Sequence, residues 1–362
     1  MNAKPKQLST RLPKSFDGPD EPWHYYLTID LVSKVLGYTI LHPWVAWVLV
    51  LCLRAQATPW ARPEMCIAIA WAFLMSLISI FTAISNRIAY GTAREVDLSE
   101  EVIVITGGVE GLGALIAEVY GMRNANVAVL DTKKVDDEEA EEKGVLYYQC
   151  DVGDAEQVEA VAKEIIEDLG PPTILINNAG IVYNKSILET TAQEAERIFR
   201  TNTLSHFHTL RTFLPHMLSS PHGGTVVTIS SVLAHLGATN LSTYTASKAA
   251  LLALHSSLRA ELSQHPNGDA VKTILVTPGQ ISTKMFAGVK TPSNFLAPVV
   301  ASVDVAREII GMVEGGRGGE IAVPLYSRWV QILGVLPVGV QTVIRRWSGI
   351  DRAMKSVGMK HE

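Results

Sequence analysis

The feature that most constrains the fold is a short β-branched run, Val102 to Ile105, that leads directly into a glycine-rich turn. The turn carries Gly107, Gly111 and Gly113, and an Ala/Leu/Ile-rich helical pattern follows it. The first glycine permits a tight turn, the second lets the backbone approach a pyrophosphate, and the third lets the helix pack on the strand. Because the free amides of a helix N-terminus bind anions, this segment with Leu112 predicts a dinucleotide-binding site.

Strand and helix patterns alternate along the rest of this region. Five further strands are predicted, at Asn126 to Leu130, Val145 to Gln149, Thr173 to Ile176, Thr225 to Ile229 and Val271 to Thr277. Such alternation predicts an α/β fold with a doubly wound (Rossmann) parallel sheet of about seven strands, which binds its ligands at the carboxyl ends of the strands. We expect this domain to span residues 95–325.

Small and polar residues follow the strands at the edge where a dinucleotide would bind. Asp131 ends the second strand, and its carboxylate can bond both adenosine ribose hydroxyls while repelling a 2′-phosphate. NAD is therefore the expected cofactor, with NADP as the alternative because Lys133 and Lys134 follow. The remaining cofactor contacts are expected from Asp151, Val152, Asn178, Ala179, Gly180, Pro278, Gly279, Ile281 and Thr283. Asp151 is expected either to bond the adenine amino group or to cap a helix.

The fifth strand is followed by residues that suit acid–base chemistry on an alcohol. Tyr244 lies thirteen residues after Ser231, and Lys248 lies four residues later, on the same face of a helix. A phenol of pKa about 10 is too weakly ionised at neutral pH, and a nearby cation lowers that pKa. We expect Ser231 to hold the substrate oxygen, and Lys248 also to bond the nicotinamide ribose. Asn202 is a candidate to hold a water that connects Lys248 to solvent, with a structural role as the alternative.

Composition excludes several other classes of function. The net charge is −5 and no Lys/Arg block exceeds two residues, so nucleic acid is not expected as a partner. The three cysteines lack the pattern of a disulfide framework, which favours a reducing compartment. No metal site is expected.

Two apolar runs precede the predicted sheet. Val35 to Leu53 is 19 residues and Met65 to Asn86 is 22 residues, both without a formal charge, and a membrane-spanning helix needs about 20. Pro43 interrupts the first run, so we expect either two passes or one re-entrant dip. A pair of buried core helices is the alternative. Seven Lys/Arg side chains flank the pair, against Arg54 and Arg62 in its loop, which places the catalytic domain in the cytosol.

These runs complete the expected domain organisation. We expect a polar tail at residues 1–34, a membrane-anchoring hairpin and connector at residues 35–94, and a substrate lid at residues 283–300 within the α/β domain. The C-terminal residues 326–362 form a further, amphipathic tail, with an uncharged stretch from Trp329 to Ile344. We expect this tail to be a membrane-surface flap over the substrate entrance, with packing on the domain or on a dimer partner as the alternative.

Together these residues resemble the short-chain dehydrogenase/reductase family over about Glu101 to Pro324. The resemblance implies that Tyr244 is the proton donor and acceptor and that Ser231, Lys248 and Asn202 complete a catalytic tetrad. Finer features look like the membrane-bound branch of retinol and 17-beta-hydroxysteroid dehydrogenases. These features are the segment from Lys284 to Thr291 and the tail from Leu336 to Met354.

The resemblance implies an NAD-dependent oxidoreductase that acts on apolar alcohols or ketones, namely retinoids, steroids or long-chain lipids. It also implies the endoplasmic reticulum membrane or the lipid-droplet surface as the location, and homodimer formation through the helices around Asn202 and Tyr244. Two alternatives stay open at this point. One is an NADPH-dependent keto-lipid reductase of the 3-ketosphinganine type, and the other is a non-catalytic lipid-droplet protein on the same fold.

Overall fold

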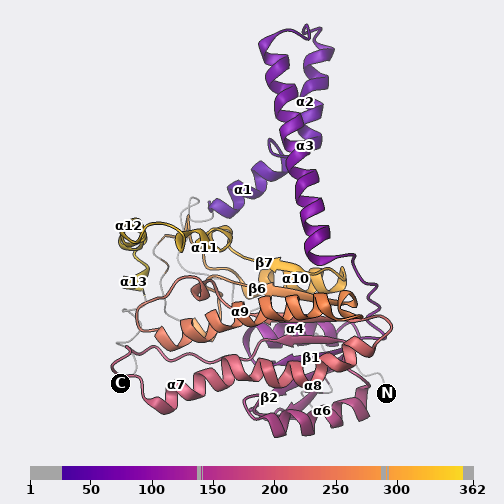
Figure 1. Ribbon diagram of the computed structural model, residues 1–362, viewed down its shortest axis with the longest axis vertical. Coiled ribbons are helices and arrows are strands. Elements are labelled where there is room, and N and C mark those ends of the chain that lie inside the picture. Colours follow the sequence, from indigo (N-terminus) through magenta and orange to yellow (C-terminus); the bar gives the residue numbers. More distant parts are fainter. Residues whose placement is uncertain (1–26, 137–139, 141, 287–290, 292, 354–362) are drawn as a thin grey trace, which may run out of the picture.

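The computed structural model describes residues 27–136, 140, 142–286, 291 and 293–353 of the chain. Most of the predicted N-terminal tail, part of the predicted lid and the last residues of the C-terminal tail lie outside these ranges. An α/β domain carries a long helical hairpin that projects from one side (Figure 1).

The α/β domain is built on one parallel seven-stranded sheet, which confirms the predicted fold class. Its strands are β1 (Val102–Thr106), β2 (Asn126–Asp131), β3 (Leu146–Gln149), β4 (Ile174–Asn177), β5 (Gly224–Ile229), β6 (Val271–Val276) and β7 (Gly319–Ile321). Their order in space is β3-β2-β1-β4-β5-β6-β7. Strand β1 pairs with β2 on one side and with β4 on the other, so the direction in which strands are added to the sheet reverses at β1. Ligands bind at such a reversal, beyond the carboxyl ends of the strands.

Helices cover both faces of the sheet, and alternate strand residues face the two layers. Ile103 and Ile105 of β1 pack against α4 (Gly111–Gly121) and α10 (Ser302–Glu314). Val102 and Val104 face the opposite layer, which contains α6 (Ala155–Leu169), α8 (Ser205–Ser219) and α9 (Ser242–Gln264). A strand buried on both faces reads as a continuous apolar run, which is why β1 was recognisable.

From residue 27, where the description begins, the N-terminal segment forms three helices, α1 (Ile29–Tyr38), α2 (Pro43–Ala55) and α3 (Pro63–Tyr90). The first apolar run is therefore not one helix, because α1 and α2 meet at a bend of 52°. Pro43 explains the bend, since proline lacks an amide hydrogen and its ring clashes with the preceding turn. At 28 residues and about 1.5 Å per residue, α3 is long and apolar enough to cross a membrane.

The hairpin helices pack on each other and leave most of their apolar surface exposed. Ala46 and Val50 of α2 meet Ala68, Ala72 and Met75 of α3 in a small cluster of their own. Only 17% of the most apolar window of α3 is buried. The alternative of two buried core helices is therefore wrong, because the described residues leave most of the apolar surface of the pair exposed.

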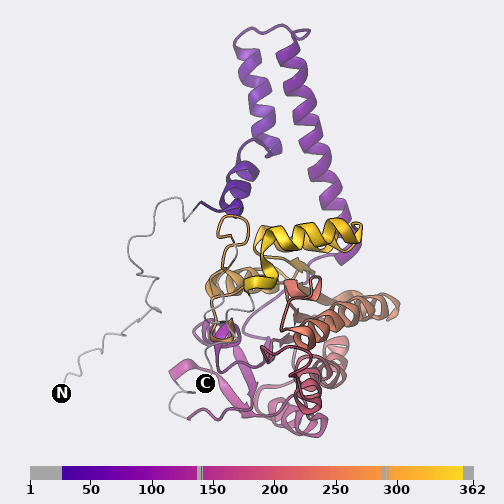
Figure 2. The same ribbon diagram turned by 90° about the vertical axis from the view of Figure 1, so that its left-hand side faces the viewer.

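The C-terminal segment forms four short helices after β7. They are η6 (Leu325–Arg328), α11 (Val330–Leu333), α12 (Val338–Ser348) and α13 (Ile350–Ala353). Both views place α11 and α12 between the hairpin and the sheet, next to α1 (Figures 1 and 2). Arg345 fixes α12 to the domain by donating to the carbonyl oxygen of Gly237 at 2.7 Å.

Candidate active site

A cavity of 660 Å³ lies at the carboxyl ends of the central strands. Sixteen of the eighteen predicted site residues line it, namely Gly107, Gly111, Leu112, Asp131, Asp151, Val152, Asn178, Ala179, Gly180, Ser231, Tyr244, Lys248, Pro278, Gly279, Ile281 and Thr283. Parallel strands end at one edge of a sheet, so residues spread over most of the domain sequence meet there. Gly113 and Asn202 do not line it, but they lie close to Gly107 and Gly180, which do.

The glycine turn needs glycine at Gly107 and Gly113, where a side chain would meet neighbouring backbone. Gly107 has φ +65°, and a Cβ atom there would lie 2.8 Å from the Cα atom of Ala179. A Cβ atom on Gly113 would clash with the carbonyl oxygen of Gly107. The residue before α4, Glu110, makes no side-chain capping bond. The first-turn amides of α4 are thus free of a side-chain cap and suit a pyrophosphate.

Asp131 lies at the end of β2, where an adenosine ribose would be held. Its carboxylate accepts hydrogen bonds from the amides of Val109 and Lys133, both at 3.1 Å. A carboxylate offers about four acceptor positions, so this one has capacity for two ribose hydroxyls. The two amide bonds fix its orientation toward the cavity.

A surface ion cluster beside Asp131 was not predicted from the sequence. Glu110 pairs with Lys133 at 2.9 Å and with Lys284 of the predicted lid at 3.3 Å. The hydrogen bond from Lys133 is the first cause that lowers the pKa of Glu110. Lys133, the basis of the NADP alternative, is therefore paired with an acid. The sequence feature that could have indicated this cluster is Glu110 itself, an acid within the glycine turn.

Asp151 lines the cavity but has partners of its own. Its carboxylate pairs with Arg200 at 2.8 Å and accepts from the amide of Gly153 at 2.9 Å. Helix α6 is capped by Asp154, which accepts from the amides of Glu156 and Gln157. The alternative of Asp151 as the helix cap is thus wrong, and its contact with adenine stays a prediction.

Ser231, Tyr244 and Lys248 meet in the buried wall between β5 and α9. The Ser231 hydroxyl interacts with the Tyr244 phenol and acts to lower its pKa. The Lys248 ammonium lies 6.0 Å from the centroid of the Tyr244 ring and donates to the carbonyl oxygen of Ile229 at 2.9 Å. The helical spacing of four residues therefore brings the two side chains together as predicted.

The expected lowering of the Tyr244 pKa is not found in this arrangement. Burial raises the pKa of Tyr244 to about 12, against a smaller lowering by Ser231. Burial also lowers the pKa of Lys248 to about 8. Both shifts have one cause, because an apolar surrounding disfavours whichever form is charged. The Lys248 ammonium bonds a backbone carbonyl, and Tyr244 is held as a neutral phenol that can donate a proton.

Asn202 lies in a π-helical turn, η2 (Arg200–Leu204), between α7 (Ala192–Phe199) and α8. Its buried side chain accepts from the amide of Ile181 at 2.8 Å and donates to the carbonyl of Ile181 and to Ser247, both at 3.0 Å. It thus joins the segment after β4 to α9, which is a structural role. A water held by Asn202 stays a prediction. Such π-turns occur frequently at functional sites.

A second cavity, of 710 Å³, meets the first at Ser231, Gly279 and Phe286. The Phe286 ring stands edge-on to Tyr244, with ring centroids 5.8 Å apart. The sequence placed Phe286 in a lid but gave no signal for this contact. Among the described residues, no three His, Cys, Asp or Glu side chains are grouped to hold a metal ion.

Comparison with known proteins agrees with this geometry. The family described as short chain dehydrogenase matches residues 101–294, just over half of the chain. The chain is 32% identical to an uncharacterized oxidoreductase of Saccharomyces cerevisiae over 68% of its own length and 82% of that protein. It is 32% identical to human short-chain dehydrogenase/reductase 3 over 72% of its length and 87% of that protein. It is also 29% identical to mouse estradiol 17-beta-dehydrogenase 11, over 66% of its length and 80% of that protein.

Proposed function

The chain belongs to the short-chain dehydrogenase/reductase family and is an oxidoreductase, and from this premise we propose that it is a membrane-anchored enzyme that transfers hydride between NAD and an apolar alcohol or ketone. One observation carries the proposal. A cavity that suits a dinucleotide, with Asp131, Asp151 and Asn178 in its lining, adjoins an apolar cavity that suits a substrate. The two share Ser231 and Phe286 in their walls, and Tyr244 lines the first.

The substrate class follows from the second cavity. Its walls include Leu233, Leu296, Trp329, Leu333 and Trp347. A cavity of this kind stabilises a ligand mainly by removing apolar surface from water, at about 25 cal/mol per Å². Retinoids, steroids and long-chain lipid alcohols have that surface, and the mouse relative is named for a steroid.

The catalytic roles follow from the protonation states. Bound at the first cavity, the nicotinamide would supply or accept the hydride. In the reduction direction, the neutral phenol of Tyr244 donates its proton to the substrate oxygen. The Ser231 hydroxyl holds the same oxygen and stabilises the charge that develops on it. Lys248 is proposed to bond the nicotinamide ribose, and Asn202 supports α9 through its hydrogen bond to Ser247.

NAD is proposed over NADP because of two acids at the ribose end of the cavity. Asp131 would repel a 2′-phosphate, and Glu110 occupies the Lys133 ammonium that would otherwise attract one. Neither carboxylate would favour the binding of a 2′-phosphate.

The membrane proposal rests on the hairpin. Most of its apolar side chains are exposed, including Trp44, Phe81 and Ile88. Contiguous apolar surface of that extent is rare on soluble monomers and marks an interaction site. We assign the hairpin to the endoplasmic reticulum membrane or a lipid-droplet surface, with the catalytic domain facing the cytosol, as the flanking Lys/Arg side chains indicate.

The test is a cofactor and substrate screen on the purified full chain in lipid nanodiscs. NAD(H) and NADP(H) are each combined with retinol, a steroid alcohol, a long-chain alcohol and the matching carbonyl compounds. We expect turnover with NAD(H) and an apolar substrate, and none in the Tyr244→Phe variant. Turnover confined to NADPH and a keto-lipid would replace this proposal with the keto-lipid reductase. No turnover in any combination, with cofactor still bound, would favour the non-catalytic alternative.

A further inference from the structure

The apolar cavity is closed by segments that are far apart in the sequence. Ile29 of α1, Leu296 and Ala297 of the predicted lid, and Trp329 and Trp347 of the C-terminal helices all line it. Its inner end reaches Ser231 beside the catalytic tyrosine. One wall of the substrate cavity is thus formed by α1, the helix that leads into the hairpin.

Two hydrogen bonds tie α1 to the other walls of this cavity. The amide of Ile29 donates to the carbonyl oxygen of Phe295 at 2.9 Å. The Asp30 carboxylate accepts from the amide of Leu325 at 2.7 Å. The N-terminal helices are therefore attached to the domain at two places, through the connector after α3 and through these bonds of α1. Helix α1 is held against the substrate cavity.

Large apolar side chains are exposed on and beside the helices that line the cavity. We define the apolar rim as Leu31 and Val35 of α1 together with Trp329, Val335, Val338 and Trp347 of the C-terminal segment, all of them exposed. Val335 is 81% exposed and Val338 is 75% exposed. Helices α1, α11 and α12 lie on the side from which the hairpin projects (Figures 1 and 2). The rim and the exposed apolar side chains of the hairpin therefore belong to elements on the same side of the domain.

Two cations accompany the tryptophans of the rim. Arg328 precedes Trp329, and Arg346 precedes Trp347. Both arginines are exposed, and neither side chain has a hydrogen-bond or ion-pair partner among the described residues. Tryptophan prefers the layer between lipid tails and headgroups, and arginine pairs with the phosphates of that layer. A protein partner would need matching acids, whereas a lipid surface supplies both chemistries over its whole extent.

We propose that the apolar rim rests in the headgroup layer of the membrane that holds the hairpin, and that substrate enters the cavity directly from the lipid. This inference rests on the proposed membrane anchoring and apolar substrate. It adds a second, interfacial contact and a route of entry. A substrate dissolved in the membrane then reaches Ser231 and Tyr244 without crossing water.

The contact is tested on the full chain in phosphatidylcholine/phosphatidylglycerol vesicles. Cys52, Cys66 and Cys150 are replaced by serine, and a single cysteine is introduced as Val335→Cys or Val338→Cys and labelled with a fluorophore. The control is Leu188→Cys, an apolar side chain that is 94% exposed just before α7, a helix that lies away from the hairpin (Figure 1). We expect nitroxide-labelled lipid to quench the rim labels, and aqueous iodide alone to quench the control.

The outcomes separate this inference from the proposal on which it rests. Failure of the protein to float with the vesicles would contradict the membrane anchor. Flotation with rim labels quenched by iodide and not by lipid nitroxide would overturn the interfacial contact alone. Rim labels shielded from both quenchers would indicate a second copy of the chain or another protein on the rim, and would overturn it too.

The route of entry has its own readout. Val338→Glu places a charge on the rim without touching the cavity lining or the catalytic residues. We expect it to raise KM for an apolar alcohol dissolved in the vesicles by about tenfold, equivalent to ~1.4 kcal/mol, with kcat unchanged. Leu188→Glu should leave both unchanged. Equal KM values for Val338→Glu and the unmodified protein would exclude entry through this rim.

Discussion

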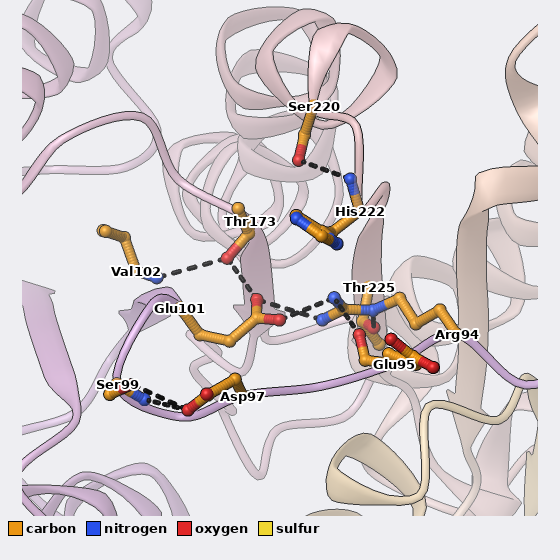
Figure 3. Close-up of polar contacts among 10 residues, drawn as sticks. All are labelled: Arg94, Glu95, Asp97, Ser99, Glu101, Val102, Thr173, Ser220, His222 and Thr225. Carbon is orange, nitrogen blue, oxygen red and sulfur yellow. Dashed lines mark hydrogen bonds and ion pairs between the residues drawn. The ribbon is translucent and has the colours of Figure 1, made fainter.

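Arg94 and Glu101 form a buried, two-bonded ion pair at the amino edge of the sheet, with nitrogen–oxygen distances of 2.6 and 3.1 Å (Figure 3). Their side chains are only 4% and 5% exposed. Arg94 also donates to the Thr225 hydroxyl at 2.9 Å, and Glu101 accepts from the Thr173 hydroxyl. The connector from the hairpin is therefore part of the catalytic domain from Arg94 onward, one residue before the boundary expected from the sequence.

This pair predicts a large loss of stability when one partner is removed. Arg94→Ala and Glu101→Ala should each lower the free energy of unfolding by about 3–5 kcal/mol, because each leaves a buried charge unpaired. The double variant should cost less than the sum of the two single variants. Chemical denaturation of the full chain in detergent measures all three.

The matched control is the exposed pair of Arg307 and Asp304 on α10. Asp304→Ala should change the free energy of unfolding by no more than about 1 kcal/mol, since solvent screens that pair. Strict additivity at Arg94 and Glu101 would mean that the buried pair is not coupled.

The second prediction concerns proton transfer. Tyr244→Phe should lower kcat by about 10²- to 10⁴-fold, because it removes the proton site and little else. The dissociation constant of the cofactor should be nearly unchanged, since the ring and its contact with Phe286 remain. Titration of the cofactor and steady-state rates on one preparation give both numbers. A variant that kept more than a tenth of the activity would remove Tyr244 from this role.

The third prediction concerns cofactor choice. Charge-assisted hydrogen bonds contribute about 1.5–3 kcal/mol, so Asp131→Ala should weaken the binding of NAD by roughly 10- to 100-fold. The same change removes the repulsion of a 2′-phosphate, so kcat/KM with NADP should increase. The comparison is kcat/KM for each cofactor with one substrate. An unchanged preference would show that Asp131 is not the selector.

The ion cluster extends this prediction to Glu110. Glu110→Gln removes the ion pair with Lys133. When it is combined with Asp131→Ala, we expect a further increase of kcat/KM with NADP. Glu110→Gln alone should leave kcat/KM with NAD nearly unchanged, because Asp131 still holds the ribose. If the double variant matched Asp131→Ala for NADP, Lys133 would have no part in cofactor choice.

The fourth prediction concerns acid stability. Burial lowers the pKa of His206 to about 3 and that of His255 to about 4, from an ordinary value near 6.5. Below pH 6.5 the unfolded chain binds protons at these residues while the folded chain does not. Stability should therefore fall as pH decreases from about 6.5 toward 4.

The measurement is Tm at pH 7.5 and pH 5. The His206→Gln/His255→Gln variant should show a smaller decrease between these values than the unmodified protein. His222→Gln, at an exposed position, should show the same decrease as the unmodified protein. Parallel pH profiles for all three would rule out the two buried histidines as the cause.

Local sequence patterns determined the sheet and most of the cofactor cleft. The β-branched run before Gly107 and the helical pattern after Gly113 are local signals, and alternation of strands and helices leaves few sheet topologies. Once the strands are parallel, residues such as Asp131 and Ser231 must meet at one edge, and Tyr244 and Lys248 must share a helix face. These features depend on neighbours in the chain, which is why they were predictable.

Only the tertiary structure decided contacts between distant segments and the electrostatics of burial. Arg94 reaches Thr225 across 131 residues, and Asp30 reaches Leu325 across 295, with no periodic signal at either position. The pairing of Glu110 with Lys133 and the contact of Phe286 with Tyr244 likewise depend on how loops pack. The direction of the Tyr244 pKa shift was predicted wrongly from the sequence, because desolvation depends on how deeply the folded chain buries the phenol.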